Sequence, residues 1–210
     1  MNKQLDEKYL LFDLGNVFVD WDKGPFVRAV ADGIDPNTAP PINYADFYWR
    51  PLRVSESKLD LGMINWVDFC EELTRIYSWS GCSKALLKSF KEIFMPNFEL
   101  IEWFQTNNFS ETLILVSNTN KYHWDWMLES LPEFLAKFDH LHLSHLISAR
   151  KPEVEYYTKL KVIKNWNKVF FCDDLADNLV IPKGFGAQVH QFEGSSGLRQ
   201  DLKKFASQNL

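Results

Sequence analysis

The feature that most restricts the fold is a series of short apolar segments, most of which end in polar side chains. β-Branched and aromatic residues are frequent in them, which at this length favours strands over helices. The segments are residues 9–13, 112–117, 140–144, 168–173 and, more weakly, 187–192. Stretches with helical spacing separate them from about residue 97 onward, most clearly residues 153–165 and 198–206. This alternation predicts an α/β fold, a three-layer Rossmann-like core with one parallel five-stranded sheet between helices.

Residues 21–95 have a different pattern, in which we expect no strand. Asn65 is suited to cap a helix, and Asp68 stands three residues later, before apolar residues at helical spacing. Residues 83–94 repeat the helical spacing. We therefore expect a core domain of residues 1–20 and 96–210, with a helical cap domain of residues 21–95 inserted after the first strand.

Composition excludes several classes of protein. With 210 residues and 46% hydrophobic residues the chain can bury a large core, and its net charge of −5 argues against a nucleic-acid or anionic-membrane partner. No apolar run approaches the roughly 18 residues of a membrane-spanning helix, and the polar N-terminus lacks the apolar region of a secretory signal. Three cysteines without a CxxC motif indicate free thiols. We expect a cytoplasmic protein, whose oligomeric state the sequence does not specify.

Polar residues collect where the predicted strands end, which is where open α/β sheets bind their ligands. These residues are Asp13 after the first strand, Ser117 and Asn118 after the second, Lys151 after the third, and Asp173, Asp174 and Asn178 after the fourth. Carboxylates, a hydroxyl and a cation in one place could bind a divalent metal and a phosphoryl group. Taken alone, each of these residues could instead have a purely structural role as a turn residue, a helix start or a helix cap.

Four motifs that contain these residues resemble those of the haloacid dehalogenase-like phosphatases. The motifs read FDLGNV from Phe12, LVSNTN from Leu115, RKPE from Arg150 and FFCDDLADN from Phe170. The resemblance extends along the whole chain, and residues 21–95 correspond to the helical cap that these enzymes carry between their first two strands. Within the family, the chain is most similar to the bacterial sugar phosphatases that include α-D-glucose-1-phosphatase.

The resemblance implies a catalytic mechanism with an aspartyl-phosphate intermediate. Asp13 would be the nucleophile that attacks phosphorus. Mg²⁺ would offset the repulsion between the two anions, held by Asp13, the backbone carbonyl of Gly15, Asp174 and Asp173. Asp174 aligns best with the family's principal metal ligand from this strand and ranks above Asp173. The expected substrate is a small phosphorylated metabolite, a sugar phosphate in particular.

The remaining motif residues would bind the phosphoryl group or support the metal site. Ser117 and the backbone N–H of Asn118 would donate hydrogen bonds to phosphoryl oxygens. Lys151 would add positive charge and keep Asp13 ionised. Asn178 would orient the acidic cluster without contacting the metal.

Gly15 departs from the family pattern, because most of these phosphatases carry an acid two residues after the nucleophile. That acid protonates the leaving oxygen, and its loss costs about 10²–10⁴-fold in rate. Another acid could substitute, with Asp20 and Asp22 the nearest in sequence. The leaving group could instead need little protonation, as in an anomeric sugar 1-phosphate. Two other functions stay open: a phosphate- or nucleotide-binding protein with little or no turnover, and a haloacid dehalogenase, which Asp173 and Asp174 disfavour since dehalogenation needs no metal.

Several other residues have two interpretations. His123 could contact the substrate, or it could be a histidine at the start of a helix. The tryptophans of residues 21–95, such as Trp49, Trp66 and Trp79, are expected mainly in the cap core, and one or two could line the substrate site.

Overall fold

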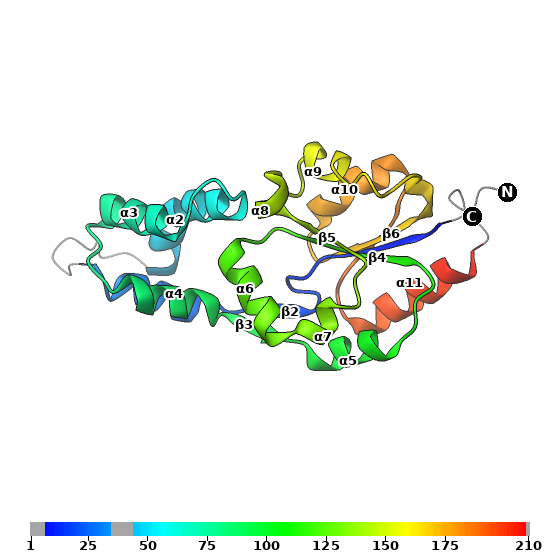
Figure 1. Ribbon diagram of the computed structural model, residues 1–210, viewed down its shortest axis with the longest axis horizontal. Helices are drawn as coiled ribbons and strands as arrows, with labels where there is room; N and C mark the ends of the chain where they lie inside the picture. Colours follow the sequence, from blue (N-terminus) through cyan, green and yellow to red (C-terminus); the bar gives the residue numbers. More distant parts are fainter. Residues whose placement is uncertain (1–6, 35–43, 209–210) are drawn as a thin grey trace.

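The larger part of the molecule is built around a five-stranded parallel sheet (Figure 1). The computed structural model describes residues 7–34 and 44–208, with side chains from residue 52 onward in the second range. The strands are β1 (Tyr9–Phe12), β4 (Thr112–Ser117), β5 (His140–Leu143), β6 (Val169–Asp173) and β7 (Gln188–Gln191). Their order is β5-β4-β1-β6-β7, and each neighbouring pair is parallel. The predicted α/β sheet is confirmed.

Helices cover both faces of the sheet, as expected for buried parallel strands. On β1, Leu10 and Phe12 face one apolar cluster while Tyr9 and Leu11 face another. The first cluster includes helices α5 (Phe98–Thr106), α6 (Lys121–Ser130), α7 (Pro132–Leu135) and α11 (Ser195–Ser207). The second includes α9 (Val154–Thr158) and α10 (Ala176–Phe185), on the opposite face in Figure 1. A short helix, α8 (Ser144–Ile147), follows β5.

One predicted helix is shorter than expected. The apolar spacing of residues 153–165 predicted a continuous helix, but α9 ends at Thr158, and turns lead to the 3₁₀-helix η2 (Trp166–Lys168). Leu160 and Ile163 are still buried against the sheet. Turns place these two side chains in the core as well as a helix would, so their spacing could not distinguish the two structures.

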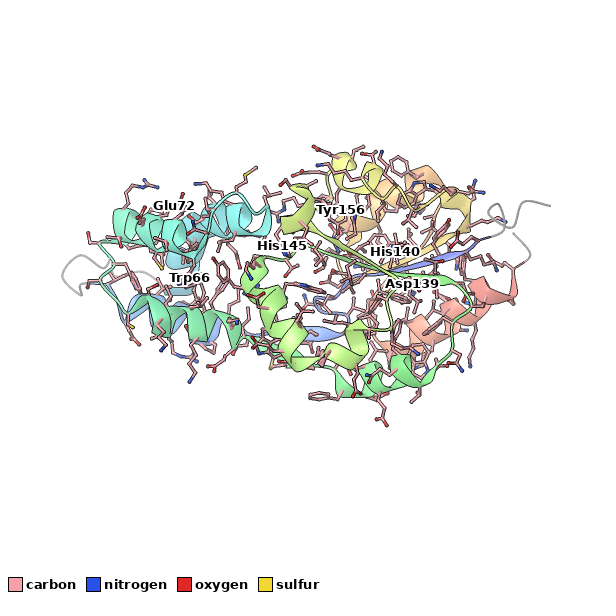
Figure 2. The ribbon with its side chains drawn as sticks, viewed as in Figure 1. Trp66, Glu72, Asp139, His140, His145 and Tyr156 are labelled. Carbon is pink, nitrogen blue, oxygen red and sulfur yellow. The ribbon has the colours of Figure 1, made fainter. Side chains whose placement is uncertain are left out.

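Four helices make up most of the described part of residues 21–95. They are α1 (Gly24–Ala31), α2 (Tyr44–Asp60), α3 (Trp66–Tyr77) and α4 (Ser83–Lys91). Asn65 caps α3, and Asp68 completes a capping box, as the sequence predicted. The helices enclose their own apolar cluster, in which Trp66 lies between the two helical layers in Figure 2. Within the described residues, no helix has the length and apolar character needed to cross a membrane.

The expectation that residues 21–95 contain no strand is wrong at both ends of that segment. Strands β2 (Val19–Trp21) and β3 (Phe94–Pro96) pair antiparallel in a separate two-stranded sheet. Each strand has only three residues, too few for an alternating pattern in the sequence. The pairing joins the two points where the chain leaves and re-enters the core. We retain residues 21–95 as a proposed cap domain on this basis.

Candidate active site

A cavity of about 300 Å³ lies at the carboxyl ends of the central strands, bordered by residues of the helical segment. Seven of the eight site residues predicted from the sequence line it: Asp13, Gly15, Ser117, Asn118, Lys151, Asp174 and Asn178. The eighth, Asp173, is fully buried beside them. The structure thus brings together residues from four loops that are up to 165 positions apart in the chain.

Three carboxylates form a cluster beside this cavity. Oxygen atoms of Asp13, Asp173 and Asp174 all lie within 4.8 Å of one another. The pKa of Asp13 is raised to about 7, chiefly by burial; Lys151 acts to lower it, and the charge of Asp173 acts to raise it. When all are ionised, three carboxylates and the Lys151 ammonium leave two negative charges uncompensated. A hard divalent cation matches both this charge and these oxygen ligands.

Lys151 connects the nucleophile candidate to the acidic pair. Its buried Nζ lies 2.8 Å from Asp13 Oδ1 and 2.7 Å from Asp173 Oδ2, and it donates to the Val116 carbonyl at 3.1 Å. Burial acts to lower the pKa of Lys151, but Asp13 and Asp173 outweigh it and raise the pKa, so the ammonium stays charged. These three partners occupy all three N–H donors. Direct contact between Lys151 and a phosphoryl oxygen therefore stays a prediction, and it requires one of these bonds to open.

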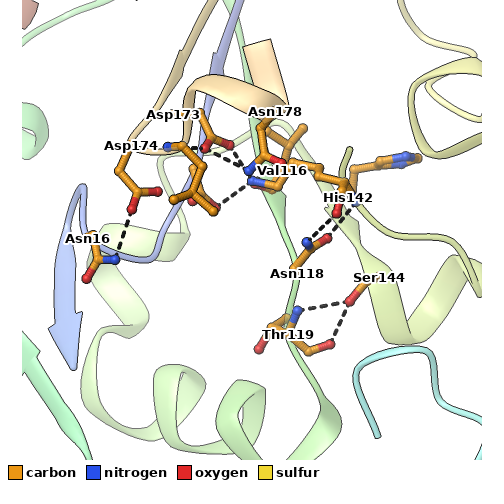
Figure 3. A network of polar contacts seen from close by, with 12 residues as sticks. Asn16, Val116, Asn118, Thr119, His142, Ser144, Asp173, Asp174 and Asn178 are labelled. Atoms are coloured by element: carbon orange, nitrogen blue, oxygen red, sulfur yellow. Dashed lines mark hydrogen bonds and ion pairs between the residues drawn. The ribbon is translucent and has the colours of Figure 1, made fainter. Parts of the chain in front are cut away.

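The two adjacent acids have different surroundings (Figure 3). Asp173 Oδ1 accepts from the Leu175 N–H at 2.9 Å and from Asn178 Nδ2 at 2.8 Å, while Oδ2 faces Lys151. Asp174 lines the cavity and accepts from Asn16 Nδ2 at 2.9 Å. Asp174 is thus better placed to bind a metal directly, and Asn178 orients its neighbour Asp173.

We expect the two acids to respond differently to substitution. Asp174→Ala should weaken Mg²⁺ affinity by at least 10-fold, because it removes an oxygen that faces the cavity. Asp173→Ala should chiefly lower the free energy of unfolding, because it leaves buried donors without an acceptor. Isothermal titration with Mg²⁺ and chemical denaturation would measure the two effects. The opposite ranking of metal affinities would show that the principal ligand is Asp173.

Asn118 links two of the loops that line the cavity through its side chain. Its Nδ2 donates to the Lys151 carbonyl at 2.9 Å, and its Oδ1 accepts from the Lys151 N–H at 2.8 Å. Nearby, Ser144 Oγ accepts from the Thr119 N–H and donates to the Thr119 carbonyl, both at 2.9 Å (Figure 3). The sequence predicted a role only for the Asn118 backbone. Its side chain fixes the position of Lys151 relative to Ser117.

Comparisons with known proteins find similar proteins over nearly the whole chain. No family profile matches the chain. A D-ribitol-5-phosphate phosphatase of Bacteroides thetaiotaomicron is 27% identical, over 93% of this chain and 96% of that protein. A HAD-family enzyme of the same species has a TM-score of 0.77 at 19% identity, over 92% of this chain and 98% of that one. A predicted HAD-like family hydrolase of Porphyromonas gingivalis has a TM-score of 0.75 at 18% identity, over 97% of this chain and 100% of that one.

The chain has the haloacid dehalogenase-like fold. The likeness to the phosphatase and to the solved structures extends over nearly the whole chain. They do not address the narrower similarity to the α-D-glucose-1-phosphatase group, which stays a prediction.

His123 is part of the cavity wall but is held by the protein itself. Its Nε2 lies 3.1 Å from the Phe90 carbonyl, its Nδ1 lies 3.1 Å from Asn120 Nδ2, and its ring stacks on Phe90 at 4.1 Å. Since a carbonyl only accepts, Nε2 carries the proton and Nδ1 accepts from Asn120. Burial lowers the pKa of His123 to about 3, so the ring is neutral.

His123 should therefore make stability depend on pH. A depressed folded pKa means that the unfolded chain binds the proton first, so stability is lost as pH falls below about 6.5. At pH 5.5 the loss should be about 1.4 kcal/mol, and it should be absent in His123→Gln. Urea denaturation of both proteins at pH 7.5 and pH 5.5 tests this. An equal loss in both would assign the acid sensitivity to other groups.

The cap tryptophans mostly pack in the interior. Trp66 and Trp79 are buried in the apolar cluster of α1–α4. The side chain of Trp49 lies outside the described residues. Among the described tryptophan side chains, Trp21 lines the cavity, and its ring lies 4.5 Å from Lys23 Nζ.

The structure adds cavity residues that the sequence did not indicate. Several of them carry charge: Lys23, Arg53, Glu56 and Asp60. Three of them lie on the polar side of α2, where no local motif distinguishes a site residue from an ordinary solvated one. Their role follows only from the position of α2 over the strand ends.

Asp20 and Asp22, the acids nearest to Gly15 in sequence, are not placed to substitute for a missing acid. Both are exposed, and neither lines the cavity. Asp20 belongs to β2, and Asp22 accepts a hydrogen bond from the Gly24 N–H at the start of α1. Val19 and Trp21 of β2 line the cavity, so Asp20 between them faces the other side of the strand, and proximity in sequence was misleading.

Proposed function

We propose that this protein is a Mg²⁺-dependent phosphomonoesterase that hydrolyses a small phosphorylated sugar or polyol. The observation that carries the proposal is the position of Asp13 in the cavity, held at 2.8 Å by the buried Lys151 and clustered with two further carboxylates. That arrangement combines a fixed carboxylate nucleophile with a site for a divalent cation.

Each residue has a defined task in the proposed reaction. Asp13 attacks phosphorus and forms the aspartyl-phosphate, which water then hydrolyses. Bound Mg²⁺ would supply the positive charge that lets an anion approach a phosphate dianion. Asp13, Asp174, Asp173 and the Gly15 carbonyl are its proposed ligands. Ser117 and the Asn118 N–H would receive the phosphoryl oxygens, while Lys151 keeps Asp13 ionised and oriented.

The acidic pair favours a phosphatase over a dehalogenase. A dehalogenase needs a carboxylate nucleophile but no metal, whereas Asp174 presents a second carboxylate to the cavity. A HAD-family enzyme of Bacteroides thetaiotaomicron with a TM-score of 0.73 and 18% identity was solved in complex with magnesium and inorganic phosphate. This likeness supports the same ligands for the present chain.

The substrate class rests on the cavity and on one relative. A volume of about 300 Å³, with several charged side chains above the strand ends, suits a small hydrophilic molecule. The relative at 27% identity acts on D-ribitol 5-phosphate, whose phosphate is on a primary alcohol. The α-D-glucose-1-phosphatase group would instead imply an anomeric phosphate. We keep both as candidate substrates.

A phosphate-release assay tests the proposal directly. The panel would contain ribitol 5-phosphate, glucose 1-phosphate, glucose 6-phosphate, nucleotides and p-nitrophenyl phosphate, each with Mg²⁺ and with EDTA. We expect metal-dependent release from a sugar or polyol phosphate, and restoration of activity when Mg²⁺ exceeds EDTA. Phosphate binding without release would instead favour a binding protein of this fold.

A further inference from the structure

The cavity contains four acids within the part of the chain whose side chains are described. They are Asp13, Glu56, Asp60 and Asp174. Asp13 and Asp174 belong to the acidic cluster. Both oxygens of Glu56 face Lys23 Nζ, at 2.9 and 3.2 Å. Of these four acids, only Asp60 belongs neither to the acidic cluster nor to an ion pair. Its carboxylate accepts a hydrogen bond from a neutral group, the side-chain amide of Asn120.

Asp60 is the last residue of α2, and its side chain is fixed against a catalytic loop. Its Oδ1 accepts from Asn120 Nδ2 at 3.0 Å. Asn120 is the N-cap of α6 and follows Ser117 by three residues. The end of α2 thereby lies beside the loop proposed to bind the phosphoryl group.

A second contact fixes the same end of α2 to another catalytic loop. Ser57, three residues before Asp60, accepts from Arg150 Nη1 at 2.6 Å. Arg150 immediately precedes Lys151, which holds Asp13. Two hydrogen bonds from the last turn of α2 therefore orient Asp60 relative to both Ser117 and Lys151.

We propose that Asp60 is the proton donor for the leaving group, the task that Gly15 cannot perform. This inference rests on the proposed phosphatase function. As the bond between Asp13 and phosphorus forms and the bond to the substrate oxygen breaks, the Asp60 carboxyl gives its proton to that oxygen. The Asp60 carboxylate then takes a proton from the water that attacks phosphorus. Cleavage of the bond to Asp13 releases phosphate and restores both side chains.

The surroundings of Asp60 suit a group that both donates and accepts protons. The pKa of Asp60 is raised to about 6, chiefly by burial and also by the charge of Glu56 on the same helix. The Asn120 hydrogen bond and the positive charges of Arg150 and Lys23 lower it. A general acid works best when its pKa lies near the operating pH.

Asp60→Asn tests the proposal, because it removes the proton and keeps an oxygen that can accept from Asn120. For an alkyl phosphate such as ribitol 5-phosphate or glucose 6-phosphate, kcat should fall by about 10²–10⁴-fold. For p-nitrophenyl phosphate, whose leaving group needs little protonation, kcat should change by less than about 10-fold. Asp20→Asn, at an exposed acid outside the cavity, is the matched control and should leave both rates unchanged.

A rescue experiment uses the space at Gly15. A Cβ added there would meet only Trp21 Nε1 at 3.9 Å, an ordinary contact distance. Gly15→Asp in the Asp60→Asn background should restore at least part of the rate on the alkyl phosphate. A restored rate would show that Asp60→Asn is slow because it lacks a proton donor, and not because α2 has moved.

The pH dependence of the wild-type enzyme gives a measurement that needs no variant. Because Asp60 must be protonated, kcat/KM for the alkyl phosphate should fall as pH rises through its pKa. The aryl phosphate should lack this decrease. Equal losses on both substrates in Asp60→Asn, or the same decrease in both pH profiles, would overturn the assignment of Asp60 while leaving the phosphatase proposal intact. Absence of Mg²⁺-dependent phosphate release in the wild type would instead contradict the proposed function.

Discussion

Asp13→Asn is expected to reduce phosphate release by on the order of 10⁶-fold, as loss of the nucleophile does in other covalent hydrolases. The amide cannot form the bond to phosphorus, and it has nearly the same shape as the carboxylate. Lys151 keeps Asp173 and the Val116 carbonyl as partners, so the loops should stay in place. Steady-state assays with each substrate of the panel, with circular dichroism to verify folding, would measure this effect.

Asp177→Asn is a suitable control for that experiment. Asp177 is an exposed acid in the first turn of α10, three residues after Asp174, and it does not line the cavity. Its substitution should leave turnover unchanged. Near wild-type rates in Asp13→Asn would show that Asp13 is not the nucleophile and that phosphate is removed by direct attack of water.

The strands and their terminal polar residues could be predicted because a buried parallel strand leaves a strong local pattern. Apolar runs such as Thr112–Ser117 must end where the backbone reaches solvent or ligand, so the strand and the site residue appear together. The predicted limits agree with all five strands of the sheet to within one residue at each end. For the same reason, Ser117, Lys151 and Asp174 could be named before their convergence was known.

The contribution of the helical segment could not be predicted in the same way. Glu56 and Asp60 are polar residues on an amphipathic helix, a pattern shared by most surface helices. Their position in the cavity depends on contacts made across the fold, such as Asp60 with Asn120 and Ser57 with Arg150. Such contacts, between residues 60 and 93 positions apart, leave no local sequence pattern.

Because the cavity residues of the helical segment could not be predicted from the sequence, the structure changes the interpretation of Gly15. From the sequence, a missing acid suggested a substrate with a good leaving group, or a substitute from Asp20 or Asp22. The structure places neither of these acids in the cavity but does place Asp60 there. If Asp60 supplies the proton, Gly15 does not restrict the substrate, and a phosphate on a primary alcohol is as compatible with the site as an anomeric one.

Lys151→Met is expected to lower the free energy of unfolding of the metal-free protein by about 3–5 kcal/mol, because it leaves buried carboxylates without their cation. Lys151 has almost no exposed surface and lies within 2.8 Å of both Asp13 and Asp173. Methionine replaces most of its volume, so the loss of charge dominates over a cavity. For a chain of this size, the melting temperature should fall by roughly 6–20 °C. Differential scanning calorimetry in EDTA measures the change.

A second substitution separates the charge effect from other consequences of losing the lysine. Asp173→Asn in the Lys151→Met background removes one of the unpaired charges, so the double variant should be more stable than the sum of the two single losses predicts. Added Mg²⁺ should also raise the melting temperature of Lys151→Met, since the ion supplies positive charge to the same carboxylates. Turnover should stay low in all of these variants, because Asp13 loses the group that orients it. A Lys151→Met protein as stable as the wild type would mean that the acids accept protons at little cost, and that Lys151 is not required to keep the nucleophile ionised.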